Sequence, residues 1–254
     1  MNSYFSKWFS KYWSLVKPAV RENMTGPGRP KGGLTQMVRK NRNFKKERIN
    51  TDSWRLQAQI IHVGCYKLCW VNCYFPVDPR TQILSDETEL TATILEIENI
   101  IENSNYNDII ISGDFNYENT RHSRHVRIIE EFLSKYDLTS VWSKFSADYT
   151  FKHISSTGIS MSTIDHFFVN SRLLENCVSA APIQLGDNPS NHSPIMLQIE
   201  IPEIVERTQI KPIYELRPNW KQAETDDTND FSQTLHEQLL KILMTQSIQC
   251  TNIL

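Results

Sequence analysis

The stretch IIISGDFN, residues 109–116, places the strongest constraint on how this chain can fold. Its three isoleucines are β-branched and apolar, and Asp108 and Gly113 bound them, which predicts a short buried strand. Side chains alternate along a strand, so Asp114 and Asn116 point to the same side if the extended conformation continues. A carboxylate and an amide placed side by side can handle a water and a phosphate together. The same residues can equally begin a loop, and spacing alone leaves both interpretations open.

The size and composition of the chain limit the classes of protein to which it can belong. Its 254 residues allow one substantial α/β domain with extensions, or two small domains. A hydrophobic content of 39% and a charged content of 22% are typical of a soluble globular protein. The net charge of −2 predicts no overall attraction to nucleic acid or membrane, so any such affinity must come from local patches. No apolar run approaches the roughly 20 residues of a membrane span.

The cysteines and the N-terminal lysines bear on the compartment. Lys7, Lys11 and Lys17 interrupt the N-terminal region, which predicts that it is not a secretory signal peptide. Cys65, Cys69 and Cys73 share strand parity and are expected to be buried free thiols, because a zinc site would need a fourth ligand. An odd number of cysteines without a secretory signal favours a reducing, intracellular location, nuclear or cytoplasmic.

Three parts are expected along the chain. Residues 1–28 form an N-terminal segment whose aromatic residues recur at helical spacing, which predicts an amphipathic segment that packs on the domain, on a partner or on a surface. Residues 29–202 hold the alternating apolar patterns of a folded domain. Residues 203–254 are expected to form a polar linker followed by an amphipathic helix.

Within the central part, apolar patterns predict an interleaved series of strands and helices. Two strands around a turn near Gly64 are expected over 54–76. Further strands are expected over 149–155, 162–170, 178–185 and 194–202, and helices over 86–103, 123–136 and 171–177. Because several strands are joined by hairpins, the sheet should be mixed and the fold class α/β (α+β). A basic run from Arg29 to Arg48 is expected to be a solvated loop unless it flanks a phosphate site.

Five short motifs, in order along the chain, resemble those of a known superfamily. They are GRPKGGL (28–34), VNCYFP (71–76), GDFN (113–116), YTF (149–151) and NPSNHSPI (188–195). With STIDH (162–166) they resemble the endonuclease/exonuclease/phosphatase superfamily, which has the DNase I-like fold. More narrowly, they are similar to the apurinic-type endonuclease domain of non-LTR retrotransposons. The resemblance implies a four-layer α-β-β-α sandwich, here lacking its first strands.

The resemblance also implies a role for each matching residue. Asp114 would orient or deprotonate the attacking water, and Asn116 would hydrogen-bond the scissile phosphate. Tyr74 would support that phosphate. His192 would stabilise charge on the pentacovalent phosphorus, with Asp165 holding its imidazole in position.

The cofactor implied by the resemblance is Mg²⁺, held by hard oxygen ligands. Asn191 stands where the family has a metal-facing aspartate, and the strands that carry the family's asparagine and its metal-binding glutamate are not found upstream of Arg29. We therefore expect magnesium binding to be weak or lost. A protein partner that covers the missing strands is also expected.

A basic cluster begins five residues after Asn116 and offers a contact for DNA. It contains Arg121, Arg124 and Arg127, which are expected to touch phosphates or to form a solvated loop and helix start. We refer to these three residues as the arginine cluster.

Two classes of function remain open at this point. The inherited function is Mg²⁺-dependent phosphodiester hydrolysis that nicks DNA, impaired in this chain. The alternative is a catalytically inactive remnant that acts as a binding or interaction module. A phosphatase for small phosphoesters or inositol lipids has less support, because GRPKGGL and the downstream RPNWKQA (217–223) resemble retroelement sequences.

Overall fold

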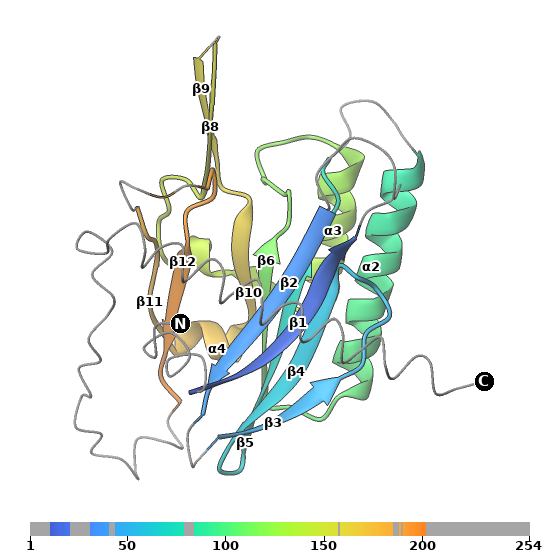
Figure 1. Ribbon diagram of the computed structural model, residues 1–254, viewed down its shortest axis with the longest axis vertical. Helices are drawn as coiled ribbons and strands as arrows, with labels where there is room; N and C mark the ends of the chain where they lie inside the picture. The colour runs from blue at the N-terminus through green and yellow to red at the C-terminus, as the bar shows by residue number, and fades with distance from the viewer. Residues whose placement is uncertain are drawn as a thin grey trace, which may run out of the picture. The chain divides into compact units, whose positions relative to one another are not determined.

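The computed structural model describes residues 11–20, 31–40, 44–78, 84–156, 158–184, 188 and 190–201 (Figure 1). The polar linker and the amphipathic helix predicted after residue 202, and the first ten residues, lie outside the described residues. The chain divides into two compact units. One comprises residues 14–36 and 41–208, and the other comprises residues 1–13, 37–40 and 209–254. All predicted site residues belong to the first unit.

A six-stranded sheet forms the centre of this first unit. Its strands, in order across the sheet, are β3 (Phe44–Ile49), β4 (Leu56–Val63), β5 (Tyr66–Tyr74), β6 (Asp108–Asp114), β10 (Asp165–Asn170) and β7 (Leu138–Ser140). The β5 and β6 strands run parallel, and every other neighbouring pair is antiparallel. The sheet is therefore mixed, as the interleaved apolar patterns predict.

Two helices pack on one face of this sheet, as Figure 1 shows for α2 (Leu84–Asn103) and α3 (Arg124–Lys135). They bury their apolar stripes against β4, β5, β6 and β10, with Leu90, Ile94, Ile97, Val126, Ile129 and Phe132 in one core cluster. The α3 helix begins after Ser123, whose side chain accepts a hydrogen bond from the backbone N–H of Val126 and caps the first turn. The helices predicted over 86–103 and 123–136 are thus confirmed, although α2 begins at Leu84.

The opposite face carries a second, smaller core. Val141 of the short helix η1 (Val141–Ser143), Leu173 of α4 (Ser171–Glu175) and Cys177 of β11 (Cys177–Pro182) contribute to it. The β11 strand pairs with β12 (Ile195–Ile199) as a separate antiparallel sheet. The α/β class is confirmed, and the four-layer arrangement stays a prediction.

Two hairpins differ from what sequence patterns predict. The β1 strand (Tyr12–Val20) pairs with β2 (Lys31–Arg39), so helical spacing of aromatic residues is misleading over the described part of the N-terminal segment. Pro18 explains the error, since proline lacks the N–H that a helix interior needs. The β8 strand (Phe151–Ser155) pairs with β9 (Gly158–Ser162), a strand that the apolar patterns do not predict, and the two project from the domain in Figure 1.

Two further expectations need correction. The described part of the basic run lies on β2 and β3 rather than in a loop, because pairing with β1 and β4 outweighs the weak strand preference of charged residues. Cys69 and Cys73 are buried free thiols as predicted, but Cys65 is exposed, because it follows Gly64 in the turn between β4 and β5. Cys177 is also a buried free thiol. None of the helices in the described ranges is long and apolar enough to span a bilayer.

Candidate active site

The candidate site lies where β5, β6 and β10 meet one edge of the central sheet. Tyr74 is the last residue of β5 and Asp165 is the first of β10, and both are register partners of Asp114, the last residue of β6. Paired residues of neighbouring strands project their side chains to the same face. The phenol and the two carboxylates therefore lie side by side, on the face opposite α2 and α3.

The backbone turns sharply just beyond Asp114. Gly113 has φ 140° in the region that favours glycine, and a Cβ there would collide with the backbone carbonyl of Cys73. Asn116 also has a positive φ of 46°, so the strand does not continue in extended form through this residue. Its backbone N–H donates to Asp114 Oδ1 at 2.9 Å, and its Nδ2 donates to the carbonyl oxygen of Phe75 at 3.0 Å. Asn116 is brought to the site by this turn and its hydrogen bonds, not by strand alternation.

His192 reaches the same edge from the loop before β12. Its Nδ1 lies 3.0 Å from Asp165 Oδ2 and 3.1 Å from Oδ1, and its backbone forms an isolated bridge with Phe151. The loop is braced locally, because Ser190 Oγ accepts a hydrogen bond from the N–H of His192 and Asn188 Nδ2 donates to its carbonyl oxygen. The structure thus brings Asp165 and His192 into hydrogen-bond contact, an arrangement that the family resemblance implied.

Thr150 ties the segments of the site together, and sequence reasoning missed its role. This buried threonine accepts hydrogen bonds at its Oγ1 from the N–H groups of Ile164 and Asp165, both at 3.0 Å. Its carbonyl oxygen accepts from the N–H of Ser193 at 2.7 Å, next to His192. In the sequence, Thr150 is recognisable only as the middle residue of the YTF motif, and this motif does not indicate the hydrogen bonds that Thr150 makes.

The site concentrates charge in a partly buried place. Burial raises the pKa of Asp114 to about 6, and the nearby Asp165 carboxylate adds to the increase, while the Asn116 N–H and His192 partly oppose it. The hydrogen bond to Asp165 raises the pKa of His192 above its ordinary value, with further help from the charge of Asp114. The carboxylates of the site therefore favour the protonated form of the His192 imidazole.

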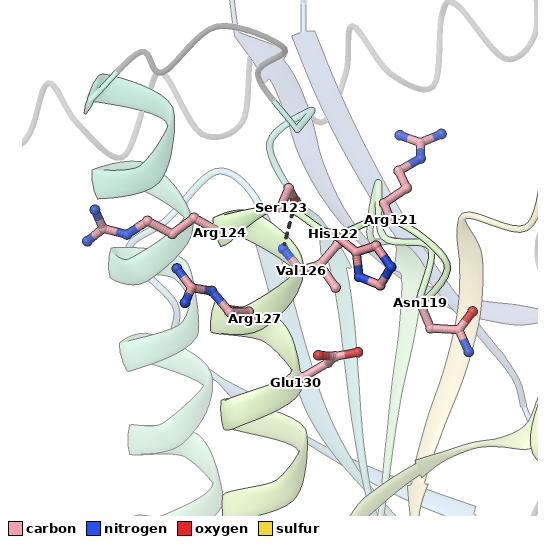
Figure 2. Close-up of a pocket in the computed structure, with 8 residues that line it drawn as sticks. All are labelled: Asn119, Arg121, His122, Ser123, Arg124, Val126, Arg127 and Glu130. Carbon is pink, nitrogen blue, oxygen red and sulfur yellow. Dashed lines mark hydrogen bonds between the residues drawn. The ribbon is translucent and has the colours of Figure 1, made fainter.

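The arginine cluster lines a separate pocket of about 350 Å³ at the start of α3, together with Asn119, His122, Ser123, Val126 and Glu130 (Figure 2). In Figure 2 the guanidinium of Arg121 projects from the loop, away from those of Arg124 and Arg127 on the helix. The three groups therefore do not converge on one point. Such spacing suits successive phosphates better than a single anion.

Two members of the arginine cluster already have acidic partners. Arg121 pairs with Glu118 at 3.0 Å, and Arg124 pairs with Glu87 of α2 at 2.6 Å. All four side chains are at least a quarter exposed, so these pairs are weak enough to exchange for phosphate. Within the described part of the chain, no acidic side chain pairs with Arg127.

Comparison with known proteins now adds to the geometry. The sequence profile of the family described as endonuclease-reverse transcriptase matches residues 68–196, which hold every site residue placed above. The chain belongs to the endonuclease-reverse transcriptase family. A search of curated protein sequences finds no match.

Solved structures with the same fold include several DNA-acting enzymes. The endonuclease domain of TRAS1, a telomere-specific non-LTR retrotransposon, is 14% identical with a TM-score of 0.56, over 74% of this chain and 80% of that chain. The AP endonuclease of Leishmania major is 12% identical with a TM-score of 0.60, over 76% and 71%. A Neisseria 3′ phosphatase bound to a product DNA hairpin is 12% identical with a TM-score of 0.55, over 78% and 82%. At these identities the likeness shows the DNase I-like fold alone.

The described residues of the site do not supply a complete set of oxygen ligands for a magnesium ion. Asp165 is engaged by His192, and the Asn191 side chain is exposed and uncharged. Asp114 is the remaining carboxylate among the described residues of the site, and its Oδ1 already accepts the Asn116 N–H. Among the described residues, no group of three or more acidic, histidine or cysteine side chains is arranged to hold a metal ion. Mg²⁺ prefers near-octahedral oxygen ligation and gives up its waters reluctantly. The donors that the described residues supply therefore do not fit a tightly bound magnesium ion.

The raised pKa of Asp114 predicts that this residue lowers stability at neutral and alkaline pH. The folded protein holds the proton more tightly than the unfolded chain, so stability from this group falls as pH rises from about 4 to about 6. An Asp114→Asn variant should be more stable than the unmodified protein by about 1–3 kcal/mol near pH 8, and nearly equal near pH 4. Denaturant unfolding at the two pH values measures this difference.

The matched control for this prediction is the same substitution at the exposed Asp148, which should change stability little at either pH. A stability difference for Asp114→Asn that does not grow with pH would show that the Asp114 carboxylate is not destabilised by its surroundings.

Proposed function

We propose that this chain engages the phosphodiester backbone of DNA at the site formed by Asp114, Asn116, Asp165 and His192, with Tyr74 beside it. The hydrogen bond between His192 and Asp165, next to a carboxylate with a raised pKa, is the observation that carries the proposal. Paired acid and base groups of this kind serve phosphodiester hydrolysis, in which water is activated and charge develops on the phosphate oxygens. The inherited reaction is hydrolytic nicking of a DNA strand.

Asp114 and His192 take the two proton-linked roles. A carboxylate with a pKa of about 6 is ionised at neutral pH and still basic enough to orient and deprotonate an attacking water. The hydrogen bond to Asp165 favours the protonated form of His192, which would place a positive charge where the pentacovalent phosphate becomes more negative. Asp165 acts on the reaction only through the imidazole, which it orients and whose cationic form it favours.

Asn116 and Tyr74 provide contacts for the scissile phosphate. The Asn116 amide has two N–H donors and uses one for the carbonyl of Phe75, which leaves the other for a phosphate oxygen. The Tyr74 hydroxyl makes no hydrogen bond to the described residues, and its ring is fixed by its neighbours Trp54 and Arg55. The Asn116 amide and the Tyr74 phenol are therefore both held in place, and each retains a hydrogen-bond donor for the phosphate.

DNA is the proposed partner for two reasons. The printed descriptions of the solved neighbours include an endonuclease of a retrotransposon, an AP endonuclease and an enzyme bound to a DNA hairpin. The arginine cluster also presents guanidinium groups at separate points, as a DNA backbone with successive phosphates would require.

Hydrolysis by this chain is proposed to be impaired, because its magnesium ligands are incomplete among the described residues. The same observation supports the alternative, a module that binds DNA without cutting it. Magnesium would supply charge neutralisation at the phosphate in this family, but the donor set described above does not hold it tightly. Losing members of a catalytic unit commonly costs orders of magnitude in rate. The chain is then expected to bind DNA better than it cuts it.

Nicking of supercoiled plasmid in millimolar magnesium tests the proposed impairment. Nicking should be absent or very weak, and any residual activity should disappear in both Asp114→Ala and His192→Ala. Asn191→Asp restores one anionic ligand, and alone should change the rate by less than about tenfold. Robust magnesium-dependent nicking by the unmodified chain that is lost in His192→Ala would contradict the proposed impairment.

Titration of DNA binding against salt tests the arginine cluster. Replacing Arg121, Arg124 and Arg127 with glutamine should weaken binding to a duplex oligonucleotide and reduce the salt slope by about 0.9 for each phosphate that the protein no longer neutralises. Fluorescence anisotropy at several salt concentrations measures both quantities. Lys135→Gln, which removes a charge paired with Glu98 in the last turn of the same helix, is the control and should leave the slope unchanged. An unchanged slope in the triple variant would exclude the cluster from the DNA interface.

A further inference from the structure

Arg55 is a buried cation close to the candidate site, and its contacts extend beyond the Tyr74 ring. It precedes β4 and is only 4% exposed. Its Nε lies 2.7 Å from Glu89 Oε1 and its Nη2 lies 2.9 Å from Glu89 Oε2, so the guanidinium makes a two-point contact with a carboxylate of α2. Such forked contacts hold both side chains in one geometry.

Arg55 is connected to Tyr74 in three ways, two of them through its guanidinium. Its Nη1 donates to the carbonyl oxygen of Tyr74 at 3.1 Å, and the Tyr74 N–H donates to the Arg55 carbonyl oxygen at 3.0 Å. Its Cζ also lies 5.1 Å from the centre of the Tyr74 ring and 4.1 Å from that of Trp54. Both backbone groups and the ring of Tyr74 are therefore held by one side chain and its own peptide group.

Trp54 completes this arrangement from the other side. A Cβ on Gly32 would collide with the Trp54 ring, so the indole packs directly on the glycine backbone of β2. The Trp54 and Tyr74 rings lie 6.2 Å apart at 52°. With Trp54 fixed by Gly32 and Arg55 fixed by Glu89, the Tyr74 ring has little freedom to move.

The contacts of Arg55 extend to Asn116 through one residue. Phe75 follows Tyr74 and donates its N–H to the carbonyl oxygen of Asp114 at 2.8 Å. The carbonyl oxygen of Phe75 accepts the hydrogen bond from Asn116 Nδ2. A shift of the chain at Tyr74 would therefore displace the side-chain amide of Asn116 as well.

We propose that Arg55, held by Glu89, is a positioning residue that fixes the Tyr74 ring, and through Phe75 the Asn116 amide, for contact with a nucleic acid phosphate. This inference rests on the function proposed above. Arg55 itself does not touch the substrate, because its nitrogens are occupied by Glu89 and Tyr74 and its planar group lies against two rings. Lysine cannot replace it, since an ammonium provides neither the fork nor the flat surface.

A purely structural role for the pair is the competing explanation, and a double-mutant cycle separates the two. Arg55→Lys keeps the charge and removes the fork, and Tyr74→Phe keeps the ring and removes the hydroxyl. Arg55→Lys should weaken binding to a short DNA duplex by about three- to tenfold, the range of one good hydrogen bond. In the Tyr74→Phe background the same change should have a clearly smaller effect, because the hydroxyl that Arg55 positions is gone and only the effect through the Asn116 amide remains.

Arg172→Lys is the matched control. Arg172 makes a similar two-point contact with Asp108, through Nε at 2.9 Å and Nη2 at 2.8 Å, at the start of β6 and so at the end away from Asp114. The Arg172→Lys variant should have a lower midpoint of unfolding in denaturant than the unmodified protein, and it should bind DNA equally well. If Arg55→Lys fails to fold, Glu89→Gln can replace it, because glutamine has the size of glutamate and keeps one acceptor oxygen for Arg55. It should weaken DNA binding less than Arg55→Lys, and again less in the Tyr74→Phe background than in the unmodified protein.

A second measurement needs no DNA. 3-Fluorotyrosine incorporated at position 74 should give a single ¹⁹F resonance that broadens or shifts in Arg55→Lys and remains unchanged in Arg172→Lys. An unchanged ¹⁹F resonance in Arg55→Lys, or equal affinity losses in both backgrounds of the cycle, would overturn the proposal. An unmodified protein that binds no DNA would instead overturn the function proposed above and the phosphate contact with it, whatever the ¹⁹F result.

Discussion

The pairing register of β6 is the constraint on which the candidate site depends. This strand pairs in parallel with β5 and antiparallel with β10, and both pairings place a partner opposite Asp114. A slip of one residue would turn Asp114 toward α2 and α3 and move Tyr74 and Asp165 out of line with it. Gly113 makes this close approach possible, because any side chain there would collide with the backbone of Cys73.

The register has an electrostatic consequence that links fold to function. It brings two carboxylates together in a partly buried place, which raises the pKa of Asp114 and draws the cationic form of His192 toward Asp165. Like charges in such a place lower the stability of the fold, and this arrangement is common where protein groups handle protons. This family member therefore keeps two neighbouring carboxylates and a histidine in a partly buried place, although the described residues supply an incomplete set of magnesium ligands.

The parts of the fold that were predictable from the sequence are those with a strong local pattern. The isoleucine run of β6 and the apolar stripe with the Ser123 cap of α3 indicated their elements directly. The β1–β2 hairpin was not predictable, because the spacing of aromatic residues in its first strand imitates a helix. The positive φ of Asn116 and the contacts of Thr150 depend on segments that are distant in the sequence. Arg55 likewise has an ordinary sequence context, and only the meeting of α2, β4 and β5 reveals its partners.

The central claim is that the acids at the ends of β6 and β10 raise the pKa of His192 and so favour its protonated form beside Asp114. An NMR titration of the histidine ring signals tests it most directly, with the His192 signal assigned by its loss in His192→Gln. The account predicts a His192 pKa above the ordinary value, a marked decrease in Asp165→Asn and a smaller decrease in Asp114→Asn, because the hydrogen bond to Asp165 is the main cause. A His192 that titrates at its ordinary pKa, and does so equally in Asp165→Asn, would contradict it.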